Sequence, residues 1–125
     1  MTVDVEKIAA AVVDSGFRVH EALGAGLLES AYENCLAYEI EERGIPVARQ
    51  VPLPVVYRGV RLEVGYRLDM VVGSCVLIEI KAIENFLPIH HAQLLTYLRL
   101  SNCRVGFLMN FNVRLFKMGV KRVVL

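Results

Sequence analysis

At 125 residues, the chain is long enough for a core of its own, and we expect one domain over residues 1–125. Hydrophobic residues make up 55% of it, but no run reaches the roughly 18 apolar residues that a membrane helix needs, which argues against a membrane-spanning protein. The net charge of +1 conceals an acidic segment over residues 1–48 and a basic one over residues 49–125, a distribution that permits an anionic partner such as nucleic acid without requiring one.

We expect a cytoplasmic homodimer. The first residues lack the basic and apolar regions of a signal peptide. Cys35, Cys75 and Cys103 are odd in number and lie in apolar contexts, which is typical of reduced core thiols rather than of a zinc or disulfide set. The high apolar fraction without a membrane span predicts a deep sheet core together with a subunit interface.

Two helices are predicted at the start of the chain. Apolar residues recur at helical spacing over residues 4–23, although Gly16 weakens the middle of this segment. The glycine-rich residues 24–26 then break the helix, and a second helix is predicted over residues 27–43. Glu29 falls in the first turn of the second helix, where a carboxylate interacts favourably with the helix dipole.

Extended segments follow the two helices. Two prolines make residues 51–57 an edge or irregular strand, because proline cannot donate to a sheet ladder. Residues 60–72 alternate well enough to form a long strand with partners on both sides. After a turn at residues 73–74, residues 75–81 are almost wholly apolar and predict a central, buried strand.

The rest of the chain predicts a crossover. A helix is expected over residues 88–100, with Pro88 in its first turn. A buried strand is expected over residues 104–109, and a terminal hairpin over residues 113–117 and 120–125. The order is α-α-β-β-β-α-β-β, with a possible further strand. A helix between two apolar strands implies a right-handed crossover and a parallel pair, so the predicted class is α/β with a mixed sheet.

Charged residues interrupt the apolar pattern at the end of the strand predicted over residues 75–81. Glu79 and Lys81 point to one side because side chains alternate along a strand, and the hairpin brings Asp69 back beside them. Two carboxylates suit a hard cation such as Mg²⁺ or Mn²⁺, which would also hold water and phosphate. Lys81 could position the attacking water or neutralise developing negative charge. The alternative is a salt bridge between Lys81 and one carboxylate, with no further role.

Three short motifs then coincide. Residues 26–32, Gly-Leu-Leu-Glu-Ser-Ala-Tyr, fit the pattern Gly-x-x-Glu-x-x-Tyr. Asp69, nine residues and then residues 79–81, Glu-Ile-Lys, fit an Asp…Glu-x-Lys core, and Gln93 and Tyr97 fit Gln-x-x-x-Tyr. Each motif alone is weak. Their order, and their coverage of essentially the whole chain, resemble the GxxExxY proteins, a group within the PD-(D/E)XK nuclease superfamily.

The resemblance implies a restriction-endonuclease-like fold, in which helices flank a mixed β-sheet. It also implies a metal-dependent site to which the first helices contribute an additional acid and the crossover helix contributes two polar side chains. The implied site comprises the metal ligands Asp69, Glu79 and Glu29, the catalytic lysine Lys81, and Gln93 and Tyr97.

Three functions are open at this point. The first is a nuclease that hydrolyses phosphodiester bonds in DNA with Mg²⁺ or Mn²⁺. The second is a catalytically weak nucleic-acid-binding module of the same fold, and the third is a structural or assembly protein whose apolar surface serves a partner. The intact trio of Asp69, Glu79 and Lys81 favours the nuclease, since a decayed site is expected to lose at least one of them.

Other polar side chains near the motifs are expected to be structural. His20 is expected to be a satisfied core or surface residue rather than a metal ligand. Tyr32 is expected to pack in the core beneath Glu29, and His90 and His91 to lie on a helix surface. Gln93 is the exception, because it shares a helix face with Tyr97.

Overall fold

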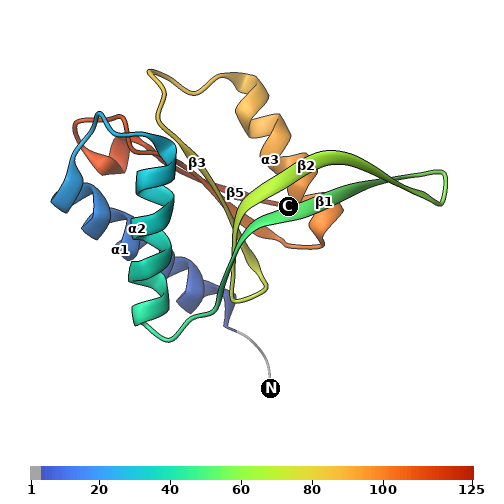
Figure 1. The fold of residues 1–125 in the computed structure, drawn as a ribbon, viewed down its shortest axis with the longest axis horizontal. Coiled ribbons are helices and arrows are strands. Elements are labelled where there is room, and N and C mark those ends of the chain that lie inside the picture. The colour runs from blue at the N-terminus through green and yellow to red at the C-terminus, as the bar shows by residue number, and fades with distance from the viewer. Residues whose placement is uncertain (1–3) are drawn as a thin grey trace.

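The computed structural model describes residues 4–125, which form a five-stranded sheet with helices on both faces (Figure 1). Among these residues, no helix is long and apolar enough to cross a membrane. The elements are α1 (Val5–Leu23), α2 (Glu29–Glu42), β1 (Val47–Tyr57), β2 (Val60–Val72), β3 (Val76–Lys81), α3 (Pro88–Ser101), β4 (Val105–Asn110), the 3₁₀ turn η1 (Phe116–Met118) and β5 (Val120–Val124).

The strands lie in the sheet in the same order as in the chain, from β1 to β5. β3 and β4 are parallel, because α3 carries the chain from the end of β3 back to the start of β4. The other three neighbouring pairs are antiparallel. The predicted α/β class, the mixed sheet and the parallel pair are therefore confirmed.

Apolar side chains form one core on each face of the sheet. Ile78 and Ile80 of β3 are buried in the core beneath α1 and α2. Leu77 belongs to the opposite core, where Leu94 and Leu98 of α3 are also buried. β3 is thus covered on both faces, as its apolar run predicts.

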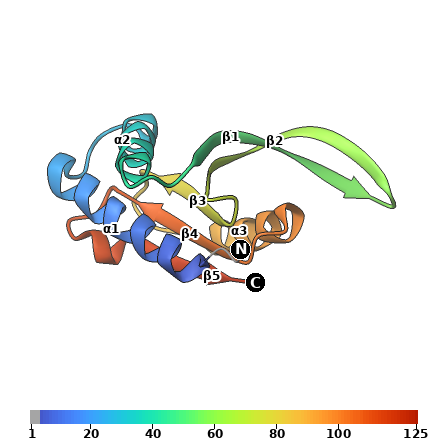
Figure 2. The same ribbon diagram turned by 90° about the horizontal axis from the view of Figure 1, so that it is seen from below.

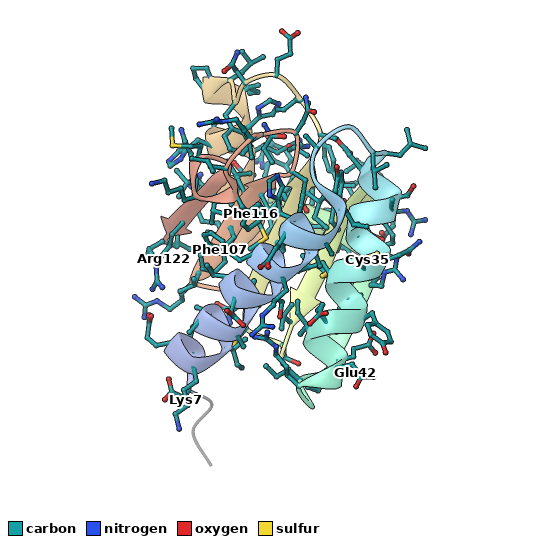
Figure 3. The ribbon with its side chains drawn as sticks, turned by 90° about the vertical axis from the view of Figure 1, so that its left-hand side faces the viewer. Lys7, Cys35, Glu42, Phe107, Phe116 and Arg122 are labelled. Atoms are coloured by element: carbon teal, nitrogen blue, oxygen red, sulfur yellow. The ribbon has the colours of Figure 1, made fainter. Side chains whose placement is uncertain are left out.

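The middle of α1 packs closely against the ring of Phe116. Figure 3 views the face of the sheet that α1 and α2 cover, with Phe107 and Phe116 beside α1. A Cβ atom at Gly16 would lie only 2.6 Å from the Phe116 ring, so the glycine admits that ring. His20, one turn later, stacks on Phe116 with ring centroids 5.4 Å apart. This packing against Phe116 explains why α1 contains Gly16, although glycine disfavours helices.

The β1–β2 ribbon projects beyond the rest of the sheet (Figure 2). β1 and β2 pair along nearly their whole length, with a shift of register between Leu53 and Val55. β2 pairs with β3 only over Met70, Val71 and Val72, so the prediction of partners on both sides is wrong for the earlier part of β2. The two prolines fit into β1 because it is an edge strand, as expected.

The predicted terminal hairpin is wrong. Residues 113–117 form no strand, and β5 pairs instead with β4. Phe116 is only 3% exposed, and its ring lies 4.8 Å from that of Phe111, so this segment is a loop that anchors an aromatic residue in the core. The amide of Asn110 donates to the carbonyl of Gly119 at 2.8 Å and closes the loop. Of the apolar residues here, Phe116 anchors the loop while Leu115 is 46% exposed, so their spacing does not reflect strand pairing.

Candidate active site

Asp69 and Glu79 lie at the fork, the point where β2 and β3 diverge. The pairing of the two strands ends at Met70 and Ile78, so Asp69 and Glu79 would form the next pair. The Asp69 amide instead donates to Oε2 of Glu79 at 2.8 Å, and the Ile80 amide donates to Oδ2 of Asp69 at 2.8 Å. Each carboxyl group is therefore fixed by the backbone of the other strand, and the predicted convergence of the two carboxylates is found.

Both carboxyl groups lie in a poorly solvated environment. Glu79 is 6% exposed, and burial, followed by the negative charge of Asp69, raises its pKa to about 8. Burial also raises the pKa of Asp69, and its hydrogen bond from Ile80 opposes this rise. Because charge at this depth is costly without a counter-charge, the fork favours a bound cation or a retained proton.

Lys81 follows Glu79 on the same side of β3 and is partly buried. Its positive charge opposes the rise in the pKa of both Asp69 and Glu79, although burial is the larger effect on each. None of the ion pairs within 4.0 Å that join residues 4–125 includes Lys81. The salt-bridge interpretation of Lys81 is therefore not what the described structure shows.

Glu29 approaches the fork from α2. Its Oε2 accepts a hydrogen bond from the Ala82 amide at 3.1 Å, just beyond the end of β3. Glu29 and Asp69 line one cavity of about 430 Å³. We call this the acidic cavity; its lining residues are Glu29, Ser30, Glu33, Gln50, Asp69 and Ile80.

Glu33 is a residue of the acidic cavity that the motifs did not predict. It follows Glu29 by four positions on α2, so both side chains lie on the same helix face. Arg49 pairs with its Oε2 at 2.8 Å, and the side-chain Nε2 of Gln50 donates to its Oε1 at 2.7 Å. The four-residue spacing from Glu29 could have indicated Glu33 in the sequence, but only once Glu29 is known to lie at the fork.

The donor set of the fork suits a hard divalent cation. Carboxylate oxygens are the ligands that Mg²⁺ prefers, and the described bonds engage one oxygen of each of Asp69, Glu79 and Glu29. Over residues 4–125 these three do not form a group of three or more His, Cys, Asp or Glu close enough to share an ion. Asp69 and Glu79 are thus brought together, while Glu29 shares the acidic cavity with Asp69.

Tyr97 and Gln93 approach the fork from α3. Tyr97 is 6% exposed, and its pKa is raised first by burial and then by the negative charge of Glu79, which places it near the carboxylates. Its ring centroid lies 6.1 Å from that of Tyr66 in β2. Gln93 and Tyr97 line a second cavity together with Tyr66, so Gln93 does not line the acidic cavity.

Several polar residues near the motifs have structural roles. The Tyr32 hydroxyl donates to the Gly24 carbonyl at 2.6 Å and accepts from the Leu27 amide at 3.1 Å, which fastens the loop before Glu29. His20 is 8% exposed and its Nε2 lies 2.7 Å from the carbonyl of Val113, so it is a satisfied core residue, as expected.

Two residues have more definite roles than the sequence suggested. The Leu87 amide donates to Nδ1 of His90 at 2.9 Å, so His90 caps the start of α3 rather than merely lying on its surface. Asn110 is 2% exposed, and its side chain donates to the Ile83 carbonyl and accepts from the Ile83 amide. Asn110 thereby holds the segment that follows Lys81.

Comparison with known proteins gives one result. A family model described as the PD-(D/E)XK nuclease superfamily matches residues 6–123. No curated protein and no solved structure gives a significant match, so the GxxExxY group within the superfamily remains a resemblance. The mixed sheet between helices is also consistent with the restriction-endonuclease-like fold. Because the match spans nearly all of the described sequence, the chain belongs to the PD-(D/E)XK nuclease superfamily.

Proposed function

We propose that this protein is a nuclease that hydrolyses phosphodiester bonds in DNA with Mg²⁺ or Mn²⁺ held by Asp69 and Glu79. Membership of the superfamily indicates a nuclease-type function, and nucleases of this superfamily generally use divalent metal ions. The observation that carries the proposal is the fork, where two carboxyl groups with raised pKa values are fixed by each other's strand.

The proposed roles follow from position. Asp69 and Glu79 would hold the ion at the fork, and Glu29, which lines the acidic cavity with Asp69, would contribute a further carboxylate. A divalent ion supplies two things in such a site, a more acidic bound water and stabilisation of negative charge on the phosphate. Lys81 leaves β3 beside Glu79, where its ammonium group stabilises charge that develops on the phosphate.

Gln93 and Tyr97 are proposed to position the substrate. Both come from the crossover helix, whose position on β1 and β4 is fixed by its buried leucines. The Gln93 amide offers both donors and an acceptor, and the Tyr97 hydroxyl lies near the carboxylates. A bound strand held from this side is directed towards the fork.

The charge distribution supports a nucleic-acid substrate. No acidic residue follows Glu84, whereas six basic residues do. Arg122 is occupied by Glu6 at 2.5 Å, but the other five take no part in the ion pairs of residues 4–125. Free basic side chains attract phosphates and make the affinity for nucleic acid fall with salt.

One observation favours a second candidate, a nucleic-acid-binding module with little catalysis. Within residues 4–125, Glu29, Asp69 and Glu79 are not gathered into a three-ligand group. A site that bound a cation weakly would still attract a phosphate backbone through the basic surface. Metal affinity therefore separates the two candidates.

Calorimetry with Mn²⁺ tests the proposed ligands. Asp69→Asn and Glu79→Gln should each weaken Mn²⁺ binding strongly, because each removes one charged oxygen donor from the fork. Glu42→Gln is the matched control, since Glu42 is an exposed carboxylate at the far end of α2 from Glu29. Binding that is unchanged in both fork variants would disprove the metal assignment.

A further inference from the structure

A second cavity, also of about 430 Å³, lies beside the fork between the β1–β2 ribbon and α3. We call it the tyrosine cavity. Ribbon residues form one wall and α3 forms the other. The residues that matter for its chemistry are Val55 and Tyr66 from the ribbon and Ile89, Gln93, Thr96 and Tyr97 from α3.

The lining of the tyrosine cavity suits a flat, largely apolar ligand with polar edges. Two aromatic rings and aliphatic side chains form most of its surface, and no charged side chain lines it. The Gln93 amide and the Thr96 hydroxyl provide donors and acceptors at one wall. A phosphate does not fit this lining, because no positive charge lies there to pair with it. A nucleobase does fit, because it has both an aromatic face and a hydrogen-bonding edge.

The tyrosine cavity is close to the proposed metal ligands. Tyr66 precedes Asp69 by three residues on β2, so their Cα atoms lie roughly 10 Å apart and their side chains leave opposite faces of the strand. Tyr97 lines the cavity and also senses the negative charge of Glu79. A nucleotide bound through its phosphate at the fork can therefore direct its base, or that of its neighbour, into the cavity.

The two tyrosines are differently exposed. Tyr97 is 6% exposed and forms the floor, while Tyr66 is 47% exposed and offers its ring to a ligand. Their rings are tilted at 55° to each other and so do not stack face to face, and the Tyr66 ring is exposed enough to stack with another aromatic group. Stacking between a base and an aromatic side chain is a sequence-tolerant way to hold a single strand.

We infer that the tyrosine cavity receives one unstacked nucleobase of the strand whose phosphate binds at the fork. The inference rests on the proposed function and narrows its substrate to single-stranded or locally unpaired nucleic acid. A base inside an intact duplex is stacked on both faces and cannot enter the cavity unless it is first extruded. Tyr66 is then a specificity-determining residue.

The binding test compares short single-stranded and duplex DNA by fluorescence anisotropy with Ca²⁺, which takes oxygen ligands as Mg²⁺ does, in place of Mg²⁺ or Mn²⁺. The wild type should prefer the single strand, and Tyr66→Ala should reduce that preference at least about fivefold, the loss of one base stack. Tyr66→Phe should keep the preference, because it keeps the ring. Tyr57→Ala is the matched control, since Tyr57 lies on the same ribbon, is 62% exposed and does not line the cavity.

The cleavage test uses single-stranded DNA that lacks one base at a defined position, with Mn²⁺. In the wild type, cleavage of the bond at one fixed distance along the strand from the missing base should be at least about fivefold slower than in DNA with all its bases. Tyr66→Ala should cleave that bond equally fast in both substrates. Cleavage without any such slowing, or an equal effect in Tyr57→Ala, would overturn the inference while leaving the nuclease proposal standing.

The experiments distinguish failure of the proposed function from failure of the cavity inference. A wild type that cleaves no substrate contradicts the proposed function, yet a single-strand preference that depends on the Tyr66 ring would still support the base-binding cavity. A wild type that binds duplex as tightly as single strand overturns the cavity inference, whatever its activity. A preference that survives in Tyr66→Ala overturns it as well.

Discussion

At the scale of single residues, the carboxyl groups of Asp69 and Glu79 end the pairing of β2 with β3 and build the fork. Each accepts a hydrogen bond from a backbone amide of the opposite strand, so neither can turn away without breaking a buried bond. Burial raises the pKa of both groups, and the negative charge of Asp69 raises the pKa of Glu79 further. Such raised values are common at functional sites.

The stability of the metal-free protein should therefore depend on Glu79. Its pKa is about 8 in the folded chain, against an ordinary value of 4.5, so between these pH values the folded state holds a proton that the unfolded state has lost. The free energy of unfolding should fall as pH rises from about 4.5 to about 8. Glu79→Gln, which stays uncharged, should flatten much of this fall.

Thermal melting in a metal chelator, followed across that pH range, measures the effect. Mn²⁺ should reverse the loss at high pH, because the ion replaces the proton at the fork. A melting temperature that does not fall between pH 5 and 8 in the wild type, or that falls to the same extent in Glu79→Gln, would contradict the assignment of the raised pKa.

Residue patterns predicted the fork but not its surroundings. Strand alternation was sufficient to place Asp69, Glu79 and Lys81 together, because a hairpin leaves few alternatives for its geometry. Glu33 and Tyr66 were missed because their roles depend on how α2 and the ribbon lie against the fork. That placement is set by packing between distant segments, which local spacing does not encode.

At the scale of elements, the start of α2 is fixed by a side chain rather than by a cap. The cap residue Leu28 makes no side-chain hydrogen bond, whereas the buried Tyr32 hydroxyl holds the loop at Gly24 and Leu27. This loop leads directly into Glu29. The Gly-x-x-Glu-x-x-Tyr pattern is thus a structural unit, in which the tyrosine positions the segment that presents the glutamate.

Tyr32→Phe should therefore affect both stability and the site. Removing the hydroxyl leaves the Gly24 carbonyl and the Leu27 amide without their partner, which costs about 1–3 kcal/mol in the free energy of unfolding. Mn²⁺ binding should also weaken, because Glu29 loses its fixed approach. Tyr38→Phe on the same helix is the control, since Tyr38 is 64% exposed. Equal denaturation midpoints for the two variants would refute the role of Tyr32.

The elements predicted best were those with strong periodicity and clear breaks. α1, α3 and β3 were found close to their expected bounds because glycine, proline and apolar runs delimit them. The segment over residues 113–117 was misread because Phe116 is apolar for a tertiary reason, its packing against Gly16 in α1. Local spacing in a single sequence does not distinguish a loop anchored by one apolar residue from a short strand.

At the scale of the whole molecule, the outer part of the β1–β2 ribbon is an exposed apolar surface. Val60, Leu62 and Val64 lie on one face of β2 because alternate residues share a face, and they are 57%, 43% and 51% exposed. No other element of residues 4–125 covers this part of the ribbon (Figure 2). Exposed apolar surface of this kind is typical of interfaces.

The homodimer therefore stays a prediction with a defined surface. Light scattering should show a dimer at about tens of micromolar, a concentration suited to a modest interface. Val64→Asp should shift the protein towards monomer, while Arg61→Asp, on the opposite face of the ribbon, should not. A wild type that remains monomeric at that concentration would rule out this interface.

The most direct test of the proposed nuclease is Lys81→Ala, measured beside the wild type and the exposed Lys7→Ala control for Mn²⁺-dependent cleavage, DNA affinity and melting temperature. Lys81 takes no part in the described ion pairs, so its charge is free to act on the transition state. Cleavage should fall about 10²–10³-fold in Lys81→Ala while DNA affinity and melting stay close to wild type. Unchanged cleavage with a lowered melting temperature, or a wild type that cleaves neither DNA nor RNA with Mg²⁺ or Mn²⁺, would contradict the account.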